Sequence, residues 1–363
     1  MAPVDPPPKL PIVRIILHIG MPKAGSTALQ AALAAARRPL GKAGVLYPKG
    51  AFNHNFLVAG IAPVNRLGRV FAQQYRGDAD KIRADFAAFW QGIVDSIDRR
   101  RPEVVVLSAE SLFNGLWSGG PEPLRRLFEP LGGRLEIVCY VRRPSDHYLS
   151  MAQQQLKASS VLPAFGPVAY RRPLEVALAA AAAVHVVAYD RNLFPGGDIV
   201  ADFAARFLPG TGVELHAVAD AKVKPSMSAE AMDIVQAFRR EHHVGEDNRF
   251  TRGTGVLMRG LAEREAALGG QRRPQLLPAV RTHIEQSSVD VLFLRDSFGI
   301  VFEGIDYDRI ALADRVQPGA VGDICVVDPD RRALLAEAVA GLDIPVGEAA
   351  RKFRAVPSAR SGA

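Results

Sequence analysis

Short runs of apolar residues alternate with helical segments in the N-terminal part of the chain, and this alternation constrains the fold more than any other feature. Continuous apolar strands that alternate with helices are typical of a parallel sheet with helices on both faces. We therefore predict an α/β fold, and we expect Pro39 to end the first helix. The apolar runs cover residues 12–19, 103–108, 135–141 and 184–188, and the helical patterns cover residues 27–38, 82–98, 146–157 and 174–182.

The C-terminal part of the chain has a different and mainly helical character. Ser228 precedes a helical pattern and is a suitable N-cap residue. A second apolar stripe predicts one helix over residues 278–295, and a short strand is expected over residues 321–327. We therefore predict a helical C-terminal elaboration of the α/β domain.

The charge balance indicates the kind of ligand. The chain of 363 residues carries a formal net charge of +7, and a basic excess favours anionic ligands. Its arginine pairs, such as Arg239–Arg240, are scattered among acidic residues without interleaved aromatic side chains, so most are expected at the surface. This pattern is not typical of nucleic-acid binding. We expect an anionic partner that is not a nucleic acid.

Cysteine usage and hydropathy indicate the compartment. Two cysteines cannot form a disulfide framework and are typical of a reducing environment. No apolar stretch is long enough to span a bilayer, and no targeting segment is evident. We expect a cytoplasmic protein, with attachment at the inner face of the membrane left open. The histidine pair His242–His243 is expected to be solvated, and no metal site is expected.

Residues 20–27 (GMPKAGST) form a glycine-containing loop between the first apolar run and the first helix. Such a loop binds phosphate, because glycines let the backbone approach the anion and the helix N-terminus adds a positive dipole. Gly20 and Gly25 have P-loop spacing, but Ser26 stands where the P-loop lysine belongs, and Lys23 supplies the cation instead. The predicted sheet is therefore P-loop-like. The alternative is a turn and helix cap with a solvated Lys23.

A second polar cluster follows the third apolar run. Arg142 begins it, Pro144 comes two residues later, and Ser150 lies about one turn into the next helix. Ligands of open α/β sheets bind beyond the carboxyl ends of the strands, where an arginine can hold a phosphate with two N–H groups. The alternative is a solvated loop in which Ser145 caps the helix. Together, the two loops favour a nucleotide with two separated phosphate groups.

These loops resemble the cofactor motifs of the 3′-phosphoadenosine-5′-phosphosulfate-dependent sulfotransferases, most closely those of the bacterial, carbohydrate-type branch. Residues 18–30 (HIGMPKAGSTALQ) match the phosphosulfate loop, and Arg142, Pro144 and Ser150 match the 3′-phosphate motif. Smaller likenesses lie at residues 46–48, 53–55, 108–110, 189–190, 225–228 and 296–299. The resemblance covers one domain over residues 12–302, followed by a C-terminal extension over 303–350, with flexible tails expected at 1–11 and 351–363.

The resemblance implies the sulfotransferase fold and in-line transfer of a sulfuryl group from this nucleotide to a hydroxyl or amine of a carbohydrate-type acceptor. The product would be 3′-phosphoadenosine-5′-phosphate, the acceptor a glycan or glycolipid, and no metal would take part. Lys23 would neutralise the negative charge that develops on the leaving group. The other cofactor-binding residues would be Ala24, Gly25, Ser26 and Thr27 at the 5′-phosphate, with Arg142 and Ser150 at the 3′-phosphate.

Attack by a hydroxyl needs a general base. Glu110 is the first candidate, because it follows the second apolar run at the same edge of the predicted sheet. Its alternative role is that of a helix-capping or salt-bridging residue. His54 is the second candidate, and its alternative is a structural or solvated loop histidine.

Two other functions remain open from the sequence. A P-loop kinase or NTPase shares the strand, loop and helix, but it requires a lysine at the position of Ser26 and an acidic ligand for Mg²⁺. A non-catalytic glycan-binding protein on the same fold would not need Lys23, Arg142 and Ser150 together.

Overall fold

The computed structural model describes residues 13–49, 52–116, 119–218 and 226–346. The chain divides into two compact units. The first comprises residues 1–141 and 172–221, and the second comprises residues 142–171 and 222–363. The predicted tails at 1–11 and 351–363 lie outside the described residues, as do residues 347–350 of the predicted extension.

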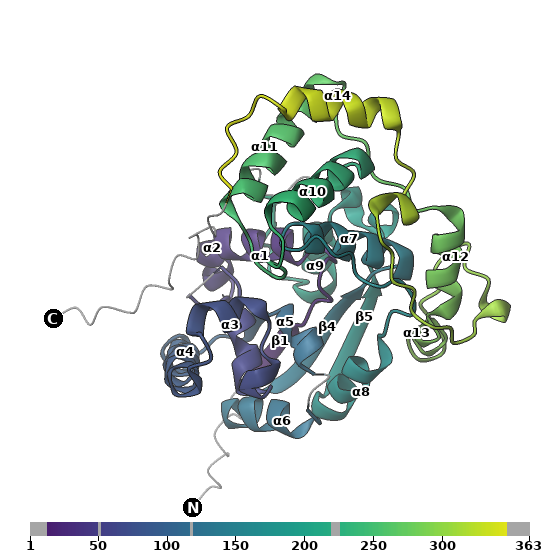
Figure 1. The fold of residues 1–363 in the computed structure, drawn as a ribbon. Helices are drawn as coiled ribbons and strands as arrows, with labels where there is room; N and C mark the ends of the chain where they lie inside the picture. The colour runs from purple at the N-terminus through teal and green to yellow at the C-terminus, as the bar shows by residue number, and fades with distance from the viewer. Residues whose placement is uncertain (1–12, 50–51, 117–118, 219–225, 347–363) are drawn as a thin grey trace, which may run out of the picture. The chain divides into compact units, whose positions relative to one another are not determined.

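A five-stranded parallel sheet forms the centre of the first unit (Figure 1). Its order is β2–β3–β1–β4–β5, so β1 is the middle strand. The central strands are buried because their runs are apolar on both faces, as a parallel sheet under helices requires. The predicted α/β fold with a parallel sheet flanked by helices is confirmed. The strands are β1 (Arg14–His18), β2 (Val45–Leu46), β3 (Val104–Ser108), β4 (Arg134–Val141) and β5 (Ala183–Ala188).

Strand order changes direction at β1. The chain passes from β1 to β2 and β3 on one side, and then to β4 and β5 on the other. Open α/β sheets bind ligands at such a point, outside the carboxyl ends of the strands. The pairing of His18 with Ser108 on β3 brings the last residues of β1 and β3 side by side. The loop at residues 20–27 therefore starts where the fold favours a ligand site.

Helices flank this sheet (Figure 1). The predicted stripe at residues 82–98 forms the longest of them, α4, which buries Ile82, Ile93 and Ile97. Phe86 and Phe89 of the same helix pack against the ring of Phe56 at 5.9 and 5.5 Å between centroids. The helices are α1 (Ser26–Ala35), α2 (Arg37–Lys42), α3 (Arg69–Tyr75), α4 (Ala79–Arg100), α5 (Ser111–Gly115), α6 (Glu122–Phe128), α8 (Arg171–Ala180) and α9 (Ile199–Phe207).

The expectation that Pro39 ends the first helix is wrong. Helix α1 ends at Ala35, and a separate helix, α2, begins at Arg37 with Pro39 in its first turn. A proline is tolerated there because the N–H groups of a first turn have no intrahelical acceptor. The apolar residues Leu29 and Leu33 of α1 are fully buried.

The second unit is helical apart from isolated bridges among its described residues. Ser228 caps α10 as predicted, since its hydroxyl accepts the backbone N–H of Ala231 at 3.1 Å. The core is an apolar cluster that includes Met232 and Val235 of α10 and Leu257 of α11. The helices are α7 (Pro144–Leu156), α10 (Ala229–His242), α11 (Arg252–Ala267), α12 (Pro278–Ser287), α13 (Asp290–Phe298) and α14 (Pro329–Val339).

Two predicted elements of this unit are wrong. Residues 278–295 form two helices, because the Ser288 hydroxyl donates to the Ile284 carbonyl (2.6 Å) at the end of α12 and accepts the Val168 N–H (2.9 Å). Residues 321–327 begin as a short 3₁₀ turn, Val321–Asp323, and their only described pairing is one bridge between Leu276 and Cys325. Apolar content alone did not distinguish a buried turn from a strand.

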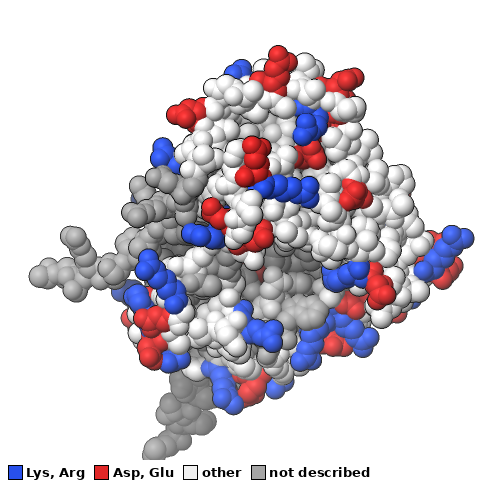
Figure 2. Space-filling view, in the orientation of Figure 1, with Lys and Arg blue, Asp and Glu red and all other residues white. Residues whose placement is uncertain are grey.

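Basic and acidic residues are interspersed over the face shown in Figure 2, in agreement with the scattered arginine pairs of the sequence. Arg239 departs from that expectation because it is fully buried. Its guanidinium donates to Thr254 Oγ1 at 2.9 Å and to the carbonyl of Ala158 at 2.8 Å. His243, which was expected to be solvated, is buried beside Thr251. The missed signal was the spacing of four residues between Arg239, on the buried side of α10, and His243, the residue that ends this helix.

Candidate functional site

The loop after β1 is held against β4. The Met21 N–H donates to the carbonyl of Tyr140 at 2.8 Å, and the Tyr140 N–H donates to the carbonyl of Gly20 at 2.7 Å. Gly25 has a φ of 80°. A Cβ at Gly25 would lie 2.8 Å from the Tyr189 ring and 2.9 Å from Ile199. Only glycine fits at this point of the loop.

The beginning of α1 is suited to an anion. Gly25 is the N-cap and has no side chain to satisfy the first N–H groups of the helix. The Ser26 hydroxyl is buried and lies close enough to the Glu110 carboxyl group to lower its pKa. Thr27 is exposed, and Ala24 is buried with its N–H directed to the carbonyl of Met21 at 3.3 Å. The Ser26 hydroxyl and the uncapped first turn of α1 have the chemistry to hold an anion such as phosphate or sulfate.

Lys23 lies in the middle of this loop and is half-buried. Its φ of 71° is in the left-handed region, which is costly for a residue with a side chain. Strained backbone of this kind clusters at functional sites. The loop thus holds Lys23 in a left-handed backbone conformation that residues other than glycine rarely adopt.

Glu110 follows β3 and lies against the same loop. A Cβ at Gly20 would be 3.3 Å from both Cα and Cβ of Glu110. Burial raises the pKa of Glu110 above its ordinary value of 4.5, while the nearby Ser26 hydroxyl and the Lys23 charge lower it. The first unit therefore brings together three of the predicted site residues, Lys23, Ser26 and Glu110.

His54 is held by the end of β3. Its Nδ1 accepts the backbone N–H of Ser108 at 3.1 Å, and its own backbone N–H donates to the carbonyl of Ser108 at 2.8 Å. The side chain is buried, and burial lowers its pKa to about 4. Because Nδ1 accepts this hydrogen bond, the neutral ring carries its proton on Nε2 and has no free nitrogen to accept another, which favours the structural interpretation of His54 over the general base.

His18 is a buried polar residue at this edge whose role the sequence did not suggest. Its Nδ1 lies 2.8 Å from the hydroxyl of Ser108, and burial lowers its pKa to about 3. His18 thus contacts the side chain of Ser108, and His54 contacts its backbone. A histidine at the end of an apolar strand was the signal available in the sequence.

Arg142 and Ser150 belong to the second unit. Arg142 directly follows Val141, the last residue of β4, and Ser150 is half-buried in α7. The hydroxyl of Tyr170, which is fully buried, donates to the carbonyl of Arg142 at 2.7 Å. This hydrogen bond holds the backbone of Arg142.

The next residue is fixed as well. Arg143 forms a bidentate pair with Glu285, with distances of 2.5 Å from Nε to Oε1 and 3.0 Å from Nη2 to Oε2. The hydroxyl of Ser145 donates to Glu285 at 2.5 Å and does not cap α7. The alternative of a solvated loop with Ser145 as the cap therefore does not describe this segment. Tyr170 and Glu285 are distant in sequence from the motif, and sequence reasoning missed both.

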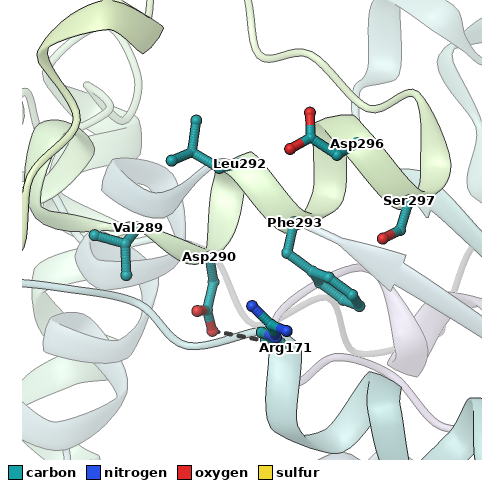
Figure 3. Close-up of a pocket in the computed structure, with 7 residues that line it drawn as sticks. All are labelled: Arg171, Val289, Asp290, Leu292, Phe293, Asp296 and Ser297. Carbon is teal, nitrogen blue, oxygen red and sulfur yellow. Dashed lines mark hydrogen bonds between the residues drawn. The ribbon is translucent and has the colours of Figure 1, made fainter.

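The second unit also contains a pocket of about 340 Å³ (Figure 3). The Arg171 guanidinium lies over the ring of Phe293 at 5.3 Å, and the Asp290 carboxylate accepts the backbone N–H groups of Tyr170 and Arg171. None of the predicted site residues lines this pocket. It is lined by Arg171, Val289, Asp290, Leu292, Phe293, Asp296 and Ser297.

Within the described ranges, no group of three or more His, Cys, Asp or Glu side chains could hold a metal ion. No helix in the part of the chain that the structure describes is long and apolar enough to cross a membrane. The chain matches no protein-family model, no curated protein and no solved structure.

Proposed function

We propose that the chain is a sulfotransferase that moves a sulfuryl group from 3′-phosphoadenosine-5′-phosphosulfate to a hydroxyl or amine of a carbohydrate-type acceptor. The observation that carries this proposal is the loop at the central strand, in which Lys23 and the buried Ser26 hydroxyl lie beside Glu110. A cation, an anion cradle and a carboxylate at one point are what transfer from a phosphosulfate to a hydroxyl requires.

Each unit contains residues with chemistry suited to one phosphate group of this nucleotide. The uncapped first turn of α1 and the Ser26 hydroxyl would hold the 5′ group, with Ala24, Gly25 and Thr27 completing the loop. Arg142 and Ser150 would hold the 3′-phosphate. The backbone of Arg142 is already fixed by the Tyr170 hydroxyl, which limits the conformational entropy lost on binding.

In the proposed reaction, each polar residue has one role. When bound, the nucleotide supplies the sulfuryl group. Glu110 accepts the proton of the acceptor hydroxyl as that oxygen attacks, and burial, which raises its pKa, makes it a stronger base than an exposed glutamate. Lys23 neutralises the charge that develops on the phosphate oxygen, a contribution of about 3–4 kcal/mol for a well-placed donor. The acceptor would be a glycan or a glycolipid.

A transfer assay tests this proposal. The purified chain is incubated with the nucleotide carrying radioactive sulfate and with a panel of glycans and glycolipids, and label in the acceptor is measured. We expect label in at least one acceptor, loss of transfer in Glu110→Gln, and normal transfer in Glu129→Gln, a matched change of an exposed glutamate. Equal transfer in both variants would exclude Glu110 as the base.

A further inference from the structure

The segment at residues 53–55 contacts the segment at residues 108–111 both before and after Glu110. Asn55 contacts Ser111, which follows Glu110: the Ser111 N–H donates to Asn55 Oδ1 at 3.2 Å, and the Ser111 hydroxyl donates to the Asn55 carbonyl at 2.7 Å. His54 contacts Ser108, which precedes Glu110 by two residues, through the two hydrogen bonds described above. Four hydrogen bonds thus fix the backbone around Glu110.

The segment that makes these bonds is itself supported. The Asn55 N–H donates to Asn53 Oδ1 at 3.2 Å, which closes a tight turn through His54. The His54 imidazole and the Tyr47 ring pack edge to face, with 4.8 Å between their centroids. The Arg37 guanidinium lies over the Tyr47 ring, 5.1 Å from its centroid. The turn at residues 53–55 therefore packs against Tyr47, the residue that follows β2.

Glu110 needs this external support. It precedes α5, a helix of only 5 residues, and its own side chain does not cap that helix. A short helix contributes little stability of its own. A base must also stay within hydrogen-bond reach of the proton that it accepts, and small displacements reduce the rate strongly.

We propose that His54 and Asn55 are positioning residues, and that the turn at residues 53–55 holds the Glu110 carboxylate beside Lys23 and Ser26. The catalytic meaning of this arrangement rests on the proposed function, whereas the positioning itself does not. His54, the second candidate base, thereby receives a different role, because it binds the strand end with its acceptor nitrogen and exchanges no proton.

The first test measures the position of Glu110 without any activity. Carbon-13 NMR of protein labelled at the glutamate carboxyl carbons gives the pKa of Glu110, with Glu110→Gln to assign the signal. We expect the pKa to fall toward 4.5 in Asn55→Ala and Ser111→Ala, because the loosened carboxylate gains water and burial is the main cause of the raised pKa. Asn114→Ala, a change at an exposed asparagine of α5, should leave it unchanged.

A pKa of Glu110 that stays at the wild-type value in both variants would overturn the proposal, whatever reaction the protein performs. Thermal unfolding shows whether the variants fold. Ser111→Thr keeps the hydroxyl that donates to the Asn55 carbonyl, so Glu110 should keep its wild-type pKa in this variant.

The second test separates positioning from proton transfer at His54. A glutamine at this position keeps an oxygen that can accept the Ser108 N–H but has no group that titrates near neutral pH. We expect His54→Gln to retain transfer activity within a few-fold, and His54→Ala to lose about 10–100-fold in kcat. Equal loss in both variants would show that His54 itself carries the proton. Absence of transfer in the wild type would contradict the proposed function but leave the NMR result valid.

Discussion

The carboxyl group of Glu110 lies close enough to Lys23 for the lysine charge to lower its pKa, although burial raises that pKa more. The two residues come from the loops after β1 and β3, which are neighbours in the sheet. A base and a cation at the same sheet edge can act on the attacking and the leaving oxygen of one transfer.

Replacement of Lys23 should affect both partners of this pair. In Lys23→Ala, transfer should fall by about 3–4 kcal/mol in activation free energy, or roughly 10²–10³-fold in kcat. The pKa of Glu110 should rise further, because a charge that lowers it is removed. Steady-state kinetics and the NMR titration measure the two effects. Lys42→Ala, at an exposed lysine of α2, should change neither.

The raised pKa of Glu110 predicts a pH dependence of stability. A carboxyl whose pKa is higher in the folded than in the unfolded protein binds more protons when folded, so stability falls as pH rises through the window between 4.5 and the raised value. Glu110→Gln should therefore unfold at a higher temperature than the wild type near neutral pH, and the difference should disappear well below pH 4.5. Thermal unfolding followed by circular dichroism at several pH values gives the answer. A lower melting temperature of the variant at neutral pH would contradict the assignment of burial as the main cause.

Gly25 should tolerate no side chain. Gly25→Ala forces a Cβ into the Tyr189 ring and Ile199 at a φ of 80°, which should cost about 1–3 kcal/mol of stability and weaken nucleotide binding. Gly92 is a matched control, because it lies within α4 and a Cβ there meets nothing within 4 Å. Gly92→Ala should stabilise the protein by about 0.5–1 kcal/mol. Denaturant unfolding of both variants tests whether the signs are opposite.

The hydroxyl of Tyr170 should matter for binding as well as for stability. Tyr170→Phe removes the hydrogen bond to the Arg142 carbonyl, and Tyr148→Phe removes a similar bond to the Pro163 carbonyl in the same unit. Both changes should cost about 0.5–1.5 kcal/mol of stability. Only Tyr170→Phe should also weaken binding of 3′-phosphoadenosine-5′-phosphate, by several-fold, because Arg142 then loses its fixed backbone. Equal affinities in the two variants would show that the bond has no part in binding.

Local sequence patterns predicted four of the five strands and the loop between β1 and α1, because a buried strand and a glycine-containing turn are determined by neighbouring residues, but they missed the two-residue strand β2. They did not predict that the helical segment over 278–295 divides, since the division depends on a hydrogen bond of Ser288 with Val168. The same limit applies at the site. The positions of Lys23 and Glu110 at strand ends could be inferred, whereas the contacts of Asn55 with Ser111 and of Tyr170 with Arg142 join segments that the sequence separates.

Binding of 3′-phosphoadenosine-5′-phosphate, measured by titration calorimetry with a chelator present, tests the central claim most directly. We predict tight binding that needs no metal and is much weaker for the analogue that lacks the 3′-phosphate. Binding should be lost in Lys23→Ala and Arg142→Ala, but not in Lys42→Ala or in Arg309→Ala, a change at an exposed arginine of the second unit. Preferential, Mg²⁺-dependent binding of ATP would contradict the claim and favour a kinase or NTPase. Failure to bind any of these nucleotides while a glycan binds would favour a non-catalytic glycan-binding protein.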